Sequence, residues 1–211
     1  MSLTGPLDKY ISEHTSPEGD YLYRLFRATH VEILAPQMAS GQVQGRLLKF
    51  LVKMINPSRV LEIGTFTGYS ALCMAEGLAP GSKIYTFEVD DELEDFTRRW
   101  IEGSEHGSKV EFIIGNALEI VPALGEKFDL VFIDGNKREY VEYYEMAMEY
   151  LNDGGWVIAD NTLWDGHVIE PERQDAQTNG VRAFNDHVRS DERVEVVMLP
   201  LRDGLTIIRK R

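Results

Sequence analysis

The chain has 211 residues, of which 43% are hydrophobic and 27% are charged, as in one ordinary soluble globular domain with a full core. Its formal net charge of −13 disfavours a general nucleic-acid-binding function, because an acidic surface repels phosphate backbones. No apolar run is long enough to cross a bilayer, and the N-terminal residues lack the pattern of a signal peptide, so we expect no contact with a membrane.

The first fifty-odd residues are predicted to be helical, because segments 19–33 and 40–55 carry apolar residues at three- and four-residue spacing. We expect this helical cap (1–56) to join an α/β core (57–211) in a single domain. Five predicted strands then alternate with four predicted helices. The strands are 59–63, 83–90, 109–115, 128–134 and 154–160, and the helices are 69–77, 91–103, 116–125 and 138–151. This alternation predicts a parallel sheet with helices on both faces.

The only cysteine, Cys73, lies in the predicted helix 69–77. We expect it to be a small buried hydrophobic residue and not a nucleophile. Because a lone cysteine cannot form an internal disulfide, a reducing cytoplasmic location is expected.

The end of the chain breaks the alternation. Two apolar runs, 193–200 and 205–211, follow each other with no helix between them. Asp203-Gly204 between these runs is a hairpin signal. The sequence therefore predicts a seven-stranded, mostly parallel sheet that finishes with an antiparallel pair.

The first two strands end in residues typical of a nucleotide site. Glu62, Gly64, Gly68 and Ser70 surround the turn after the first strand, where glycines let a ligand approach the backbone. The G-x-x-x-G spacing differs from the G-x-G-x-x-G of dinucleotide sites. Glu88 ends the second strand, where an acid commonly accepts hydrogen bonds from a ribose. Together these residues favour an adenosine-type ligand over a plain turn and a solvated acid.

The later strands end in amide and carboxylate side chains. Asn116 follows the third strand and is expected either to cap the next helix or to meet an adenine edge. Asp134 ends the fourth strand, and Asp160-Asn161 end the fifth. Because these strands should be neighbours, we expect the three oxygen-bearing side chains to converge. Such hard ligands suit Mg²⁺ or Ca²⁺; the alternative is that Asp160 and Asn161 only cap a turn.

Taken together, these motifs resemble a known family. In their order and spacing they are similar to the cation-dependent O-methyltransferases of small molecules. The motifs that carry the resemblance are VLEIGTFTGYSAL, FEVD, GNALE, FDLVFIDGNKREY and VIADNTLW. That group includes caffeoyl-CoA and catechol O-methyltransferases and bacterial relatives. The resemblance runs from about residue 40 to the C-terminus and implies a Rossmann-like class I methyltransferase fold with a reversed final strand.

The resemblance also implies roles for individual residues. Lys137 matches the proposed general base, although a solvated lysine at a helix start is the alternative. The implied metal ligands are Asp134, Asp160 and Asn161. The implied S-adenosylmethionine contacts are Glu62, Gly64, Ser70, Glu88, Asn116, Ala117 and Asp134.

Some positions depart from the pattern or stay open. Gly135-Asn136 stands where plant relatives usually have Ala-Asp, so Asn136 receives no role. The roles of Met38, Trp164 and His167 are also left open. Three tyrosines at helical spacing are expected to pack in the core. They are Tyr140, Tyr143 and Tyr144.

We therefore predict an S-adenosylmethionine-dependent O-methyltransferase that acts on a small, catechol-like aromatic hydroxyl. Mg²⁺ or another divalent cation such as Ca²⁺ or Mn²⁺ is the expected metal, and a homodimer is the expected assembly. Three alternatives are a tRNA hydroxyuridine methyltransferase, a non-catalytic cofactor-binding module and a nicotinamide oxidoreductase. The net charge argues against the first alternative. The presence of Asp134, Lys137, Asp160 and Asn161 together argues against the second, and the glycine spacing argues against the third.

Overall fold

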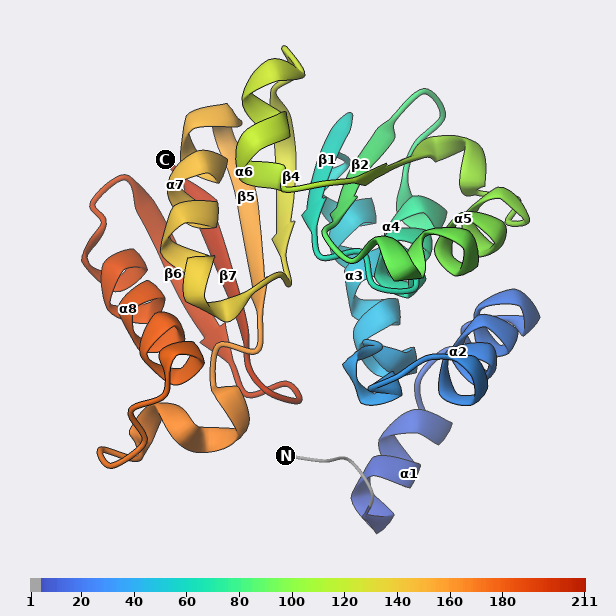
Figure 1. The fold of residues 1–211 in the computed structure, drawn as a ribbon, viewed down its shortest axis with the longest axis horizontal. Helices are drawn as coiled ribbons and strands as arrows, with labels where there is room; N and C mark the ends of the chain where they lie inside the picture. Colours follow the sequence, from blue (N-terminus) through green and yellow to red (C-terminus); the bar gives the residue numbers. More distant parts are fainter. Residues whose placement is uncertain (1–4) are drawn as a thin grey trace. The chain divides into compact units, whose positions relative to one another are not determined.

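The computed structural model describes residues 5–211. Its strands form a seven-stranded sheet in the order β3-β2-β1-β4-β5-β7-β6 (Figure 1). The strands are β1 (Arg59–Ile63), β2 (Lys83–Glu88), β3 (Val110–Ile114), β4 (Phe128–Ile133), β5 (Leu151–Asp160), β6 (Val194–Leu199) and β7 (Leu205–Lys210). The pairs β2–β3, β1–β4 and β4–β5 are parallel, whereas β7 is antiparallel to β5 and β6. The predicted strand pattern, with its reversed end, is confirmed.

The described chain divides into two compact units. The C-terminal unit contains residues 59–64 and 116–211, and the N-terminal unit contains residues 5–58 and 65–115. The prediction of a single domain stays a prediction.

The C-terminal unit is built on β4, whose side chains from Leu130 to Ile133 are fully buried. In register, Ile63 of β1 lies opposite Ile133, and Ala159 of β5 lies opposite the same residue on the other side. The carboxyl ends of β1, β4 and β5 therefore lie level at one edge of the sheet, as predicted. The helices of this unit are α6 (Ala117–Ile120), η4 (Val121–Ala123), η5 (Lys137–Glu139), α7 (Tyr140–Tyr150), η6 (Trp164–Ile169) and α8 (Ala176–Ser190).

Helix α8 was not among the predicted elements. Asp175 begins it as an N-cap, since its carboxylate accepts a hydrogen bond of 3.0 Å from the Thr178 backbone N–H. Its buried stripe includes Phe184, whose ring meets the edges of Tyr140 and Tyr144 at centroid distances of 5.5 and 6.0 Å. These tyrosines pack in the core, as expected from their spacing.

The N-terminal unit joins helices to the strand pair β2–β3. Its helices are α1 (Pro6–Glu13), α2 (Asp20–Glu32), η1 (Pro36–Met38), α3 (Gly41–Ile55), α4 (Tyr69–Gly77), η2 (Asp91–Leu93), α5 (Glu94–Glu102) and η3 (Gly107–Lys109). The predicted helices 19–33 and 40–55 correspond to α2 and α3, and α1 precedes them. None of the described helices is long and apolar enough to cross a membrane.

Helices α3 and α4 approach each other closely within the N-terminal unit. A Cβ atom at Gly45 of α3 would lie 2.6 Å from the Cys73 Sγ atom of α4. Arg46, the next residue of α3, is only 3% exposed and reaches Glu76 of α4, with 2.7 Å between Nη1 and Oε2. Cys73 is fully buried, and burial raises the pKa of its thiol to about 12, which fits the predicted packing role.

Candidate active site

The turn after β1 brings Gly64 against the backbone of Asp134. Gly64 has a φ of +98°, and a Cβ atom there would lie 2.3 Å from the Asp134 carbonyl oxygen. Asp134 in turn donates its backbone N–H to the Ile63 carbonyl at 2.8 Å. Only glycine allows this approach. The structure therefore brings together two predicted site residues, at the carboxyl ends of β1 and β4.

Glu62 lies one residue before the end of β1 and is fully buried. In register, it lies opposite Phe132 of β4. A carboxylate in such a position is costly to desolvate, which is unusual for a residue with only a packing role. Its predicted contact with the cofactor stays a prediction.

In the N-terminal unit, Glu88 ends β2 and organises the glycine turn. Its Oε2 atom accepts a hydrogen bond of 2.7 Å from the Phe66 N–H, and its Oε1 atom accepts bonds of 2.9 and 3.0 Å from the N–H groups of Val89 and Asp90. The alternative of a plain solvated charge is excluded, because Glu88 is 9% exposed and bonded by backbone. Ser70 lies in the first turn of α4 and is 6% exposed.

Asn116 is an N-cap in the C-terminal unit. Its Oδ1 atom accepts a hydrogen bond of 3.0 Å from the Leu118 N–H at the start of α6. Ala117, the first residue of that helix, is buried. The capping role that the sequence allowed is confirmed, and the predicted adenine contact of both residues stays a prediction.

Asp134, Lys137 and Asp160 form a group that we call the acidic cluster. Lys137 donates from Nζ to Asp134 Oδ1 at 3.0 Å and to the Gly135 carbonyl at 3.1 Å. Burial raises the pKa of Asp134 to about 7, the charge of Lys137 opposes that rise, and the charge of Asp160 adds to it. Asp134 and Asp160 each follow one residue of the register pair Ile133–Ala159, at neighbouring strand ends. The predicted convergence of their side chains with that of Asn161 stays a prediction.

Asp160 and Asn161 form the end of β5. Asp160 is 2% exposed, its Oδ1 atom accepts a bond of 2.8 Å from the Asn161 N–H, and its carbonyl accepts one of 3.1 Å from the Tyr140 hydroxyl. Asn161 has a φ of +57°, a left-handed conformation that asparagine tolerates better than most residues. The strand thus ends abruptly at Asp160, whose carboxylate is held by the backbone N–H of Asn161.

Lys137 is buried, so the alternative of a solvated lysine is wrong. It is 8% exposed, and its Nζ atom lies 4.9 Å from the Tyr140 ring centroid and 6.0 Å from that of Trp164. Cations are attracted to aromatic faces at such distances. Gly180 of α8 lies directly against the backbone of Lys137. A Cβ atom at Gly180 would lie 2.2 Å from the Lys137 carbonyl oxygen.

Sequence reasoning missed Tyr140 and Gly180 as supports of the cluster. Tyr140 stands three residues after Lys137 at the start of α7, and this helical spacing was the available signal. A glycine inside the apolar pattern of α8 was the other. Asn136, left without a role, caps the turn of Lys137 by accepting a hydrogen bond of 3.3 Å from the Arg138 N–H. His167 pairs with Glu170, with 2.9 Å between Nδ1 and Oε2.

Within residues 5–211, no three or more histidine, cysteine, aspartate or glutamate side chains group so as to hold a metal ion. The predicted ligand set contains two aspartates and an asparagine, so it is not of that kind. The assignment of Asp134, Asp160 and Asn161 to a metal stays a prediction.

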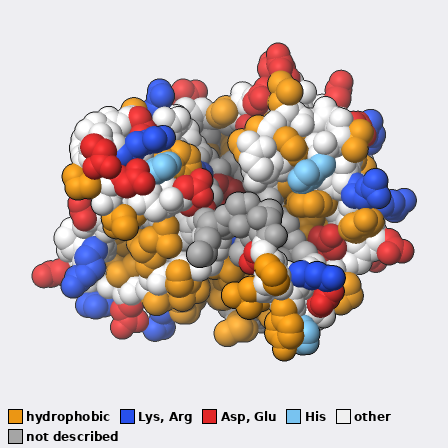
Figure 2. Space-filling view, turned by 90° about the horizontal axis from the view of Figure 1, so that it is seen from below, with side chains coloured by type: hydrophobic (Ala, Val, Ile, Leu, Met, Phe, Trp, Pro, Cys, Tyr) orange, Lys and Arg blue, Asp and Glu red, His pale blue; other side chains and the backbone are white. Residues whose placement is uncertain are grey.

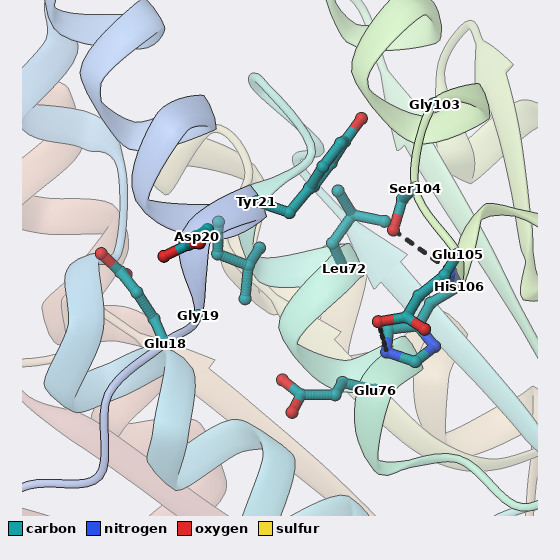
Figure 3. A pocket seen from close by; sticks show the side chains of 11 residues that line it. Glu18, Gly19, Asp20, Tyr21, Leu72, Glu76, Gly103, Ser104, Glu105 and His106 are labelled. Atoms are coloured by element: carbon teal, nitrogen blue, oxygen red, sulfur yellow. Dashed lines mark hydrogen bonds and ion pairs between the residues drawn. The ribbon is translucent and has the colours of Figure 1, made fainter.

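A separate pocket of about 380 Å³ lies in the N-terminal unit and contains none of the predicted site residues (Figure 3). Its acidic side chains include Glu76, which is already paired with Arg46 and Lys49, and Glu18, which accepts a hydrogen bond from the Tyr69 hydroxyl. These carboxylates support the packing of α2, α3 and α4, so the pocket receives no role in the chemistry.

Comparison with known proteins shows the family of this chain. The model of the O-methyltransferase family matches residues 12–211. The chain belongs to the O-methyltransferase family. A caffeoyl-CoA O-methyltransferase of Stellaria longipes is 32% identical over 204 residues, which are 92% of this chain and 84% of the relative.

Two solved structures show the same fold. The O-methyltransferase TomG of Streptomyces achromogenes, in complex with SAM, superposes with a TM-score of 0.91 at 29% identity and covers 100% of this chain and 99% of its own. An O-methyltransferase of Bacillus cereus, in complex with SAH, gives a TM-score of 0.89 at 28% identity, with 97% of each chain covered. The predicted family, the class I methyltransferase fold and the enzyme class, an S-adenosylmethionine-dependent O-methyltransferase, are confirmed.

Proposed function

We propose that this O-methyltransferase methylates a hydroxyl group of a small, catechol-like aromatic acceptor. The acidic cluster carries the proposal. Two carboxylates lie within electrostatic reach of each other at the ends of β4 and β5, and a buried lysine is bonded to one of them. A phenol with a pKa of about 10 is a poor nucleophile at neutral pH, so its reaction needs groups that remove and accommodate its proton.

The donor set of the cluster fits a hard divalent cation. Carboxylate and amide oxygens are the ligands that Mg²⁺, Ca²⁺ and Mn²⁺ prefer. The raised pKa of Asp134 supports a cation there, because Lys137 does not offset burial and the charge of Asp160. We propose that Asp134, Asp160 and Asn161 hold such a cation. When bound, it would lower the pKa of two adjacent acceptor hydroxyls and fix their orientation.

For S-adenosylmethionine we propose the residues that the family resemblance assigns. They are Glu62, Gly64, Ser70, Glu88, Asn116, Ala117 and Asp134. The bare backbone at Gly64 supports the proposal, because it would let the ligand approach the end of β1. The fixed carboxylate of Glu88 supports a contact with ribose hydroxyls.

Lys137 is the proposed general base. The carbon–sulfur bond of the sulfonium breaks as the new carbon–oxygen bond forms, and the hydroxyl proton passes to the Lys137 amine. The rings of Tyr140 and Trp164 and the Asp134 carboxylate would then stabilise the ammonium that results. S-adenosylhomocysteine leaves as the neutral second product.

Transfer of a labelled methyl group tests the proposal, with catechol, caffeoyl-CoA and bulk tRNA as acceptors, in Mg²⁺ and in EDTA. We expect methylation of the catechol that needs the divalent cation. Full activity in EDTA would refute the role of the metal, and methylation of tRNA alone would replace the acceptor class. A chain that binds S-adenosylmethionine but methylates nothing in a broad acceptor screen would favour the binding-module alternative.

A binding experiment tests the ligand assignment without catalysis. Asp160→Ala should abolish tight Mn²⁺ binding in a calorimetric titration and reduce kcat/KM roughly 100-fold or more. Asp186→Ala, which removes an exposed carboxylate of α8, is the matched control and should bind Mn²⁺ as the unmodified protein does. Equal Mn²⁺ binding by both variants would contradict the assignment.

A second copy of the chain is the proposed partner. Large hydrophobic side chains are exposed on the first three helices and the segments beside them, and Figure 2 shows hydrophobic side chains exposed on one face. They are Leu7, Tyr10, Tyr23, Val31, Leu34, Met38, Phe50 and Met54. Sedimentation equilibrium should give twice the mass of one chain, and a single-chain mass at micromolar concentration would refute the dimer.

The lone, buried cysteine supports the proposed reducing, cytoplasmic location.

A further inference from the structure

The tip of the β6–β7 hairpin, residues 201–204, is fastened to the loop that follows β5, and both belong to the C-terminal unit (Figure 1). The Asp203 carbonyl accepts hydrogen bonds of 2.8 and 3.3 Å from the N–H groups of Leu163 and Trp164. The Asp203 carboxylate accepts another from the Asp165 N–H. The hairpin tip therefore lies directly beside the loop that carries Asn161 and Trp164.

Gly204 makes this close contact possible. A Cβ atom at this position would lie 2.5 Å from the Leu163 backbone nitrogen, and the φ of Gly204 is +90°. Two residues before Gly204, the backbone of Arg202 is therefore held close to the loop. Its place next to the acidic cluster follows from the backbone and does not depend on a flexible connection.

Left-handed backbone is concentrated in these two segments. Of seven non-glycine residues with positive φ in the described chain, four lie here: Asn161, Trp164, Asp165 and Arg202. Asparagine and aspartate tolerate this conformation, but arginine at φ +49° is strained in a way that a glycine would avoid. Residues with strained backbone conformations cluster at functional sites, where the role of the side chain offsets the cost of the strain. An arginine at a position that suits glycine therefore points to a use for its guanidinium.

The hairpin tip that carries Arg202 lies beside the end of β5 that contributes Asp160 to the acidic cluster. Leu205, which follows the tip, pairs with Asp160 in register, and the Gly204 carbonyl accepts a hydrogen bond of 3.2 Å from the Thr162 N–H. Lys137 already donates hydrogen bonds to Asp134 and Gly135 from a buried position, whereas Arg202 is only half-buried. An acceptor whose hydroxyls lie at the cluster would thus meet the guanidinium with another part of its ring.

We propose that Arg202 selects acceptors that carry a carboxylate on the aromatic ring, so that the preferred substrate is a dihydroxylated aromatic acid. This inference rests on the proposed function of the acidic cluster. The planar guanidinium binds a carboxylate with two parallel hydrogen bonds, which fixes orientation as well as adding affinity. The Trp164 ring, which already lies near Lys137, would then border the aromatic ring of the same acceptor.

The test compares 3,4-dihydroxybenzoate with the neutral 4-methylcatechol. The ratio of their kcat/KM values should fall at least tenfold in Arg202→Gly, which the backbone accommodates, and in Arg202→Gln. The ratio for Arg202→Lys should be intermediate between those of these variants and that of the unmodified protein, because lysine keeps the charge but cannot form the two parallel hydrogen bonds. Arg189→Gln, which removes an exposed arginine of α8, is the matched control and should leave the ratio unchanged. An unchanged ratio in both Arg202 variants would overturn the inference.

A binding measurement separates this inference from the proposed function. Titration of 3,4-dihydroxybenzoate into protein with Mg²⁺ and S-adenosylhomocysteine should show at least tenfold weaker binding in Arg202→Gly. If this loss occurs although the unmodified protein methylates neither acceptor, Arg202 selects the acid and the methyl-transfer proposal fails. If the unmodified protein methylates 4-methylcatechol but does not bind the acid, only the role of Arg202 fails. If Arg202→Gly weakened the binding of caffeoyl-CoA alone, Arg202 would recognise a phosphate group, which also overturns the carboxylate proposal.

Discussion

Two regions of this molecule place cations against carboxylates in buried surroundings, with opposite results. We call Arg46, Lys49 and Glu76 of the N-terminal unit the arginine cluster. Both Glu76 oxygens are engaged, Oε2 by Arg46 at 2.7 Å and Oε1 by Lys49. Burial acts to raise the pKa of Glu76, but hydrogen bonds from Lys49 and Arg46 outweigh it and lower the pKa. In the acidic cluster, the pKa of Asp134 is raised.

The difference lies in the balance of charge. Two cations face one carboxylate in the arginine cluster, so its charge is compensated within the chain and the group holds α3 to α4. In the acidic cluster, Lys137 and the charge of Arg202 do not outweigh burial and the charge of Asp160 at Asp134, so a further cation would be favoured there. Buried charge that is paired within the chain has a structural role, whereas buried charge that is left in excess marks a place for a ligand.

Substitution of Lys137 should have the largest effect on catalysis. Lys137→Met should lower kcat about 1,000-fold, because the proposed general base is lost while an apolar stem of similar length remains. Binding of S-adenosylhomocysteine, measured by calorimetry, should change little. Lys53→Met, at an exposed position of α3, is the control and should keep its rate. A normal kcat in Lys137→Met would remove the acidic cluster from the chemistry.

Substitution of Arg46 should affect stability and not chemistry. Arg46→Met should lower the free energy of unfolding by about 3 kcal/mol, because it leaves Glu76 partly buried with only Lys49 as a partner. Urea denaturation followed by circular dichroism measures the change. The double variant Arg46→Met/Glu76→Gln should recover part of the loss, since the uncompensated charge is then absent. If Arg46→Met alone cost less than about 0.5 kcal/mol, the arginine cluster would not be structural.

The sequence predicted the sheet and the positions of the acidic cluster for a simple reason. Parallel strands with helical crossovers place their carboxyl ends at one edge, so Asp134 and Asp160 had to be neighbours once β4 and β5 were. The presence of the terminal hairpin followed equally from Asp203-Gly204. These features depend on local patterns and on topology alone.

Other features could not be predicted because they depend on tertiary contacts. The left-handed backbone of Trp164 and Arg202 is held by hydrogen bonds between a loop and a hairpin 38 residues apart at Asp165 and Asp203. No local pattern encodes such a pairing. Helix α8 is different, since its apolar spacing and its N-cap Asp175 were visible in the chain and were overlooked.

The raised pKa of Asp134 predicts how pH affects the cation-free protein. With a pKa of about 7 when folded and about 4 when unfolded, Asp134 gives stability at low pH that is lost as pH rises through 7. In EDTA, the free energy of unfolding should fall by about 2 kcal/mol between pH 5 and 7 relative to Asp134→Asn. Saturating Mg²⁺ should remove this fall, because a cation favours the charged carboxylate. A pH profile identical to that of Asp134→Asn would contradict the excess of negative charge.

Substitution of Gly180, through which α8 supports Lys137, should give the smallest effect. It separates the position of Lys137 from its charge, because only the position changes. Gly180→Ala raises helix propensity, yet its Cβ atom would meet the Lys137 carbonyl oxygen at 2.2 Å, so α8 must move away from η5. We expect a loss of about 1 kcal/mol in unfolding free energy and about a tenfold loss in kcat, since a small displacement of the base misaligns proton transfer. Asp186→Ala in the same helix makes a similar gain in propensity without the collision and should keep both values. A stabilised, fully active Gly180→Ala variant would show that η5 tolerates the shift and that the charge of Lys137 matters more than its exact place.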